Sequence, residues 1–99
     1  MGIFNYFKRT DPERLFGGGN GDSFETAVII NADNPLEGVQ AEYSYLSTQC
    51  GVPQRDWTIR SQSLREHGGK PHDVITIALA QGGVRTFHFD VSQFFGKEG

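Results

Sequence analysis

The chain has 99 residues, of which 36% are hydrophobic and 12% aromatic, and this size and composition exclude both two separate cores and an intrinsically disordered chain. The formal net charge is −3 at pH 7, and the sequence contains no basic run. Because nucleic-acid binding draws most of its affinity from clustered Lys and Arg, we expect no nucleic-acid partner.

The first residues have the pattern of a separate arm. Ile3, Phe4 and Phe7 fall on one side of a helical turn, and Asp11-Pro12 has the form of a helix start. The sequence leaves three uses open for this arm. It packs its aromatic groups on the domain, it docks on a partner or contacts a membrane surface peripherally through Ile3, Phe4 and Phe7, or it becomes ordered only in an oligomer.

A Gly-Gly-Gly-Asn-Gly run at 17–21 predicts a flexible joint after the arm. We therefore expect an arm and joint over residues 1–21 and a single domain over residues 22–99. The sequence shows no apolar stretch of transmembrane length and no signal-peptide pattern. Cys50 is the only cysteine, which excludes an internal disulfide, and these features together predict a cytoplasmic protein.

The next segments predict a strand followed by a helix. The β-branched run at 27–30 is typical of a strand that is buried on both faces. Asn34-Pro35 with Glu37 predicts a helix start, because Asn caps, Pro suits the first turn and Glu can reach back to a backbone N–H. The alternative is a regular helix that begins near Val39, because Gly38 weakens the first turn. The helix should end at Gly51. The apolar side chains that recur at spacings of three and four, and that should face the sheet, are Leu36, Val39, Tyr43, Leu46 and Cys50.

Residues 57–64 alternate well enough to predict another strand, although Leu64 has the opposite phase from Trp57 and Ile59. The Gly- and Pro-containing segment 66–72 predicts a longer hairpin loop.

The C-terminal third predicts a β-hairpin, because 73–79 and 84–91 alternate on either side of a loop at 81–83. In this register Ile77 lies opposite Phe87, and Ile75 lies opposite Phe89, so the large apolar groups share one face. The residues expected on the other face are Val74, Thr76, Ala78, Thr86, His88 and Asp90. The two phenylalanines of the following segment, Phe94 and Phe95, should close the rim of the core.

These elements predict an α+β fold in two layers. A mainly antiparallel, four-stranded sheet, built from elements in the chain order strand, helix, strand, strand, strand, should pack on the one principal helix, with the N-terminal arm beside it.

Catalytic and cofactor motifs are not evident. The glycine run lacks the cation of a phosphate-binding loop, because Asp22 follows it. Cys50 belongs to the predicted apolar helix face, where a buried thiol stays protonated. No three of the histidines and nearby carboxylates need to meet, so we expect no metal site, no cofactor and no catalytic residue.

The sequence therefore favours a small non-enzymatic binding or protein-interaction module that uses an exposed sheet face or edge, including self-association. The expected binding residues on the open face are Arg60, Gln62, Thr76, His88 and Asp90. An alternative is a small metal-dependent hydrolase that uses His88, Asp90 and one loop histidine, either His67 or His72.

Overall fold

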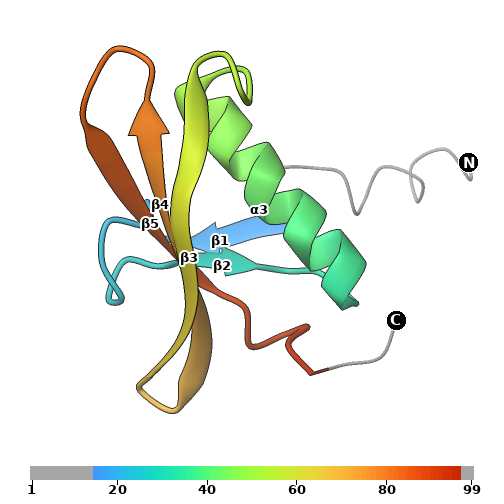
Figure 1. Ribbon diagram of the computed structural model, residues 1–99. Coiled ribbons are helices and arrows are strands. Elements are labelled where there is room, and N and C mark those ends of the chain that lie inside the picture. Colours follow the sequence, from blue (N-terminus) through green and yellow to red (C-terminus); the bar gives the residue numbers. More distant parts are fainter. Residues whose placement is uncertain (1–14, 97–99) are drawn as a thin grey trace, which may run out of the picture.

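Residues 15–96 of the computed structural model form a five-stranded sheet with the helix α3 packed on one face (Figure 1). The elements are β1 (Phe16–Gly18), β2 (Val28–Ile30), α3 (Pro35–Cys50), β3 (Trp57–His67), β4 (Lys70–Leu79) and β5 (Val84–Asp90). The strand order is β1-β2-β5-β4-β3, in which β2 and β5 are parallel and all other neighbours are antiparallel. The predicted α+β class is confirmed. The predicted arm, with Ile3, Phe4 and Phe7, lies outside the described residues.

The sheet has one strand more than the sequence predicted. The additional strand is β1, which takes Gly17 and Gly18 from the glycine run that was expected to be a joint. The division between residues 1–21 and 22–99 stays a prediction, but the structure pairs Phe16–Gly18 with β2 inside the sheet.

The predicted start of α3 is confirmed, whereas its predicted buried face is largely wrong. Asn34 caps the helix by accepting a hydrogen bond from the Glu37 backbone N–H at 3.0 Å. Leu46 is buried as predicted, but the other buried positions are Gly38, Ala41 and Glu42, whereas Leu36, Val39 and Tyr43 are exposed.

The reason for this helix orientation is a close approach at Gly38. A Cβ atom at Gly38 would lie 2.3 Å from the ring of Phe94 in the turn that follows β5, so only a residue without a side chain lets α3 approach this ring so closely. Small residues on the inner face therefore outweigh the apolar periodicity.

The C-terminal hairpin has the predicted faces but a register that differs by two residues. Ile75 lies opposite Phe87, and Ile77 lies opposite Arg85. The shift occurs because the Leu79 N–H donates to the Gly83 carbonyl at 3.0 Å, which makes residues 80–82 the loop. A shift of two residues leaves every side chain on its own face, so Phe87 is buried as expected.

The hairpin formed by β3 and β4 differs from its prediction in two features, a β-bulge and a tight turn. The register between β3 and β4 shifts between Ile59 and Ser61, and this bulge brings Leu64 back to the helix side of the sheet. The expected long loop is a two-residue turn, because β3 ends at His67 and β4 begins at Lys70. Gly68 and Gly69 supply the positive φ angles that such a turn needs.

The core lies between α3 and the helix-facing side of the sheet. Its fully buried large side chains include Ile30, Leu46, Ile75, Ile77, Phe87 and Phe89. Phe94 closes one rim as predicted, whereas Phe95 is exposed.

Candidate functional site

The face of the sheet that is turned away from α3, here called the distal face, carries all three histidines of the chain. The ring of Phe24 stacks on His67 with centroids 4.4 Å apart and meets His88 at 4.7 Å and His72 at 5.3 Å. The rings of His67 and His72 lie 6.1 Å apart. We call Phe24 and these three residues the histidine cluster.

The strand registers explain why the three histidines share a face. His72 on β4 lies opposite Arg65 on β3, two residues before His67. On its other side it lies opposite Asp90 of β5, two residues after His88. Since residues on one strand share a face at spacings of two, the three rings form a diagonal row across three strands. The sequence contained one signal for this row, because Gly68-Gly69 predicts a tight turn rather than a long loop.

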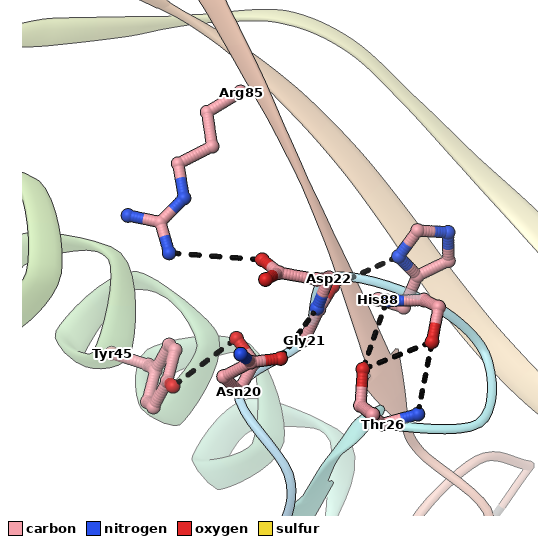
Figure 2. A network of polar contacts seen from close by, with 8 residues as sticks. Asn20, Gly21, Asp22, Thr26, Tyr45, Arg85 and His88 are labelled. Atoms are coloured by element: carbon pink, nitrogen blue, oxygen red, sulfur yellow. Dashed lines mark hydrogen bonds and ion pairs between the residues drawn. The ribbon is translucent and has the colours of Figure 1, made fainter.

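Phe24 reaches the distal face because the loop between β1 and β2, residues 19–27, is fixed to the sheet by hydrogen bonds (Figure 2). The Gly21 carbonyl accepts from the backbone N–H of His88 at 2.7 Å and from the His88 ring Nδ1 at 2.9 Å. Inside the loop, the side chains of Ser23 and Thr26 bond each other at 3.0 Å. The glycine-rich segment is therefore held in one conformation at its centre.

Two contacts connect the same loop to other elements (Figure 2). The Tyr45 hydroxyl of α3 donates to the Asn20 carbonyl at 3.4 Å. Asp22 forms an ion pair with Arg85 of β5 at 3.8 Å, and Arg85 also lies over the Phe87 ring at 4.4 Å from its centroid. These contacts place the loop across the end of the sheet formed by β2 and β5.

The hydrogen bonds of two histidines determine which ring nitrogen carries a proton. A carbonyl oxygen only accepts, so Nδ1 of His88 must donate to Gly21, and Nδ1 of His72 must donate to the Lys70 carbonyl at 3.0 Å. In the neutral rings this leaves Nε2 as the acceptor. His67 differs, since its Nε2 lies 3.5 Å from a carboxylate oxygen of Glu25.

Three of the predicted binding residues lie on the distal face. His88 belongs to the histidine cluster, and Thr76 bonds the Thr86 hydroxyl at 2.8 Å across the strands. Asp90 is buried, and one of its oxygens accepts from the backbone N–H and hydroxyl of Ser92 at 2.9 and 2.7 Å. Thr76 and Asp90 therefore make structural hydrogen bonds within the sheet and its C-terminal turn.

The other two predicted binding residues do not join this group. The bulge begins at Arg60, which is exposed on β3, and places Gln62 opposite Ile75, on the helix side of the sheet. The sequence prediction placed Gln62 on the distal face because it assumed an unbroken alternation.

The hydrolase alternative requires His88, Asp90 and a loop histidine to converge. Within residues 15–96, no group of three His, Cys, Asp or Glu side chains is placed to hold a metal ion. The ring of Phe24 packs against His67, His72 and His88, so these side chains make aromatic contacts. Cys50 borders a hollow of about 410 Å³ by the β4–β5 turn, whereas the histidines lie on the distal face.

A buried carboxyl group lies between α3 and the sheet, where the sequence predicted only apolar side chains. Glu42 is 0% exposed, and neither of its carboxyl oxygens has a hydrogen-bond donor among the described residues. Burial, followed by the nearby Asp73 carboxyl, raises the pKa of Glu42 to about 10. Desolvation and a neighbouring negative charge both disfavour the ionised form, so Glu42 retains its proton in the folded chain.

Strand β3 is an open edge of the sheet. It ends the strand order, and within the described residues it pairs along its length with β4 alone, apart from one bridge between Pro53 and Trp57. Every residue from Arg60 to His67 is exposed except the half-buried Ser63. Backbone N–H and C=O groups on such an edge are available to another strand.

The helix α3 carries an exposed row of apolar side chains, one of which contacts the start of β3. Leu36, Val39 and Tyr43 follow each other at helical spacing, and we call them the α3 stripe. The Tyr43 ring meets Trp57 of β3 with centroids 6.4 Å apart. Tyr45, on the opposite side of the helix, instead meets Phe16 of β1 at 5.2 Å. Within the α3 stripe, Tyr43 therefore lies beside the start of β3.

The comparisons with known proteins add no further assignment. No family model, curated protein or solved structure matches this chain. Among the helices in residues 15–96, none has the length and apolar character needed to cross a membrane.

Proposed function

We propose that this chain is a non-enzymatic protein-interaction module that binds a protein partner through the open edge of β3. The observation that carries the proposal is the eleven-residue length of β3 and its pairing on one side only among residues 15–96, with nearly all of its residues beyond Ile59 exposed. A strand added to such an edge gains main-chain hydrogen bonds, and neighbouring side chains supply the specificity.

The β3 edge is favoured over the distal face because groups of the same chain already cover or bond part of the distal face. The loop that carries Phe24 covers part of it, and Thr76 and Asp90 already bond neighbouring side chains. The β3 edge instead carries the exposed side chain of Leu64, and the exposed Tyr43 of α3 lies beside the start of the same strand. The proposal includes a cytoplasmic location, which the single cysteine, Cys50, supports.

Site-specific photo-crosslinking in cells tests this function. A photoreactive amino acid replaces Leu64 on β3 in one variant and Val84 at the start of β5 in the control. Both positions carry exposed apolar side chains, but only Leu64 is on the open edge. We expect protein adducts at Leu64 that are absent at Val84. Equal adduct yields at the two positions, or none at either, would refute the proposal.

A further inference from the structure

Three exposed features occur together on one side of the molecule. They are the open edge of β3, the side chain of Leu64, which is 49% exposed on the helix side of the sheet, and the α3 stripe. The contact between Tyr43 and Trp57 places the last residue of the α3 stripe beside the start of β3. A single partner that extends the sheet at β3 therefore has access to all three features.

We propose that the partner is a second copy of this chain, paired with the first through antiparallel β3 strands around a two-fold axis at Leu64. This inference rests on the proposed function and names the partner of the same edge. The pairing joins the two sheets into one continuous sheet through main-chain hydrogen bonds, as in strand addition by an extended peptide.

The bulge and the charges of β3 select this axis. After the bulge, the regular part of β3 runs over residues 61–67, and Leu64 is its midpoint. An axis at Leu64 therefore pairs the regular segment with itself along its whole length. Leu64 then lies opposite its own symmetry mate, and Gln62 lies opposite Glu66 on the same face, where the amide can donate to the carboxylate.

Neighbouring registers fit less well. An axis at Arg65 places two guanidinium groups directly opposite each other, which destabilises a strand pair. An axis at Ser63 pairs Ser61 with Arg65 and brings the bulge residue Arg60 opposite Glu66, where the extra residue disrupts a ladder. Charged residues and bulges on edge strands also discourage association, but here the bulge is outside the seven regular residues.

The same symmetry places the exposed apolar side chains of both copies on one face of the joined sheet. A two-fold axis perpendicular to a sheet keeps both helices on one face of the joined sheet. Tyr43, whose ring meets Trp57 of β3, is the α3 stripe residue placed beside this strand, and the two Leu64 side chains lie opposite each other at the axis on the helix side of the joined sheet. Removal of these side chains from water adds an apolar contribution to the strand pairing.

Sedimentation of the purified full-length chain over a range of concentrations measures the association directly. We expect a monomer–dimer equilibrium, and we expect Leu64→Lys to raise the dimer Kd by roughly a hundredfold because two ammonium groups would meet at the axis. The matched control is Val84→Lys, which places the same charge at an exposed position on β5, and it should leave the dimer Kd unchanged. Circular dichroism of both variants checks that they remain folded.

Disulfide trapping locates the axis without disturbing the charge. In a Cys50→Ser background, Leu64→Cys should form a cross-linked dimer under mild oxidation, whereas Val84→Cys should remain monomeric.

A wild-type chain that stays monomeric at all concentrations would overturn the self-pairing. So would a dimer that is indifferent to Leu64→Lys. Either result leaves the proposed function standing if the photo-crosslinks at Leu64 join this chain to a different protein. Adducts with the mass of two copies of this chain support both proposals, and an absence of any adduct at Leu64 refutes the proposed function itself.

Discussion

The buried carboxyl of Glu42 should make the free energy of unfolding fall as the pH rises. The unfolded chain has the ordinary pKa of 4.5 at this position, whereas the folded chain holds the proton up to a pKa of about 10. Between these values the unfolded state releases a proton that the folded state retains, so the folded state loses stability with increasing pH. The contribution of this group is complete below pH 4.5 and is lost progressively above it.

The magnitude follows from the slope of this linkage. One bound proton corresponds to about 1.4 kcal/mol per pH unit, so a rise from about pH 5 to about pH 7 should reduce the stability by about 3 kcal/mol. This is a large part of the roughly 5–15 kcal/mol that stabilises a typical domain.

Glu42→Gln tests the reasoning, because the amide is neutral at every pH and has nearly the same shape. Urea unfolding at several pH values should give equal stabilities near pH 5 and a more stable variant near pH 7, by about 3 kcal/mol. Glu25→Gln is the control. Its carboxylate is exposed, and the ion pair that it forms with His67 should contribute no more than about 1 kcal/mol.

Asp73→Asn separates the two causes of the pKa shift. Burial is the larger cause, so most of the pH dependence should persist when the neighbouring charge is removed. The difference in the free energy of unfolding between wild type and Glu42→Gln could also stay the same from pH 5 to pH 7. That result would show that the Glu42 carboxyl is ionised in the folded protein, and it would refute the reasoning.

Three further substitutions test the packing. Gly38→Ala should lower the stability by about 1–3 kcal/mol in urea unfolding despite the better helix propensity of Ala, because its Cβ would overlap the Phe94 ring. The control Gln40→Ala, on the exposed surface of the same helix, should not lower the stability. Phe24→Ala should lower the stability by about 1–2 kcal/mol, as expected for a half-buried ring, and should shift the NMR signals of all three histidine rings. Gly68→Ala should cost about 1 kcal/mol in thermal unfolding through its positive φ alone, since no atom crowds the site, and Gly68→Asn should cost less.

Alternation along the C-terminal strands was enough to predict which side chains are buried, but not the register. Ile75 and Phe87 face the helix in both the predicted and the observed pairing, because the two pairings differ by an even number of residues. The register itself depends on which residues form the loop, and with Gly82 and Gly83 adjacent more than one loop has the necessary conformational freedom. The alternation of apolar and polar residues determines which face of the sheet a side chain is on, whereas the geometry of the turn determines which residue lies opposite it.

The histidine cluster depends on contacts that no local pattern contains. Gly21 and His88 are 67 residues apart, and their hydrogen bonds fix the loop that carries Phe24. The glycine run predicts a joint because glycine is also the usual residue of flexible linkers. Gly21 is instead buried with a φ of +88°, close to the Val28 side chain, so close packing and a positive φ favour glycine here.

The orientation of α3 connects the stability of the fold with the proposed interaction surface. Rotation of the helix by about a third of a turn would bury the α3 stripe and expose Glu42, an exchange that transfer energies favour. The observed orientation instead keeps an unfavourably buried carboxyl and leaves three large apolar side chains exposed, with Gly38 packed closely against the Phe94 ring. If the α3 stripe becomes buried against a second copy at the β3 edge, its apolar side chains are removed from water in the assembly. The exposed row and the open edge then have a single physical explanation.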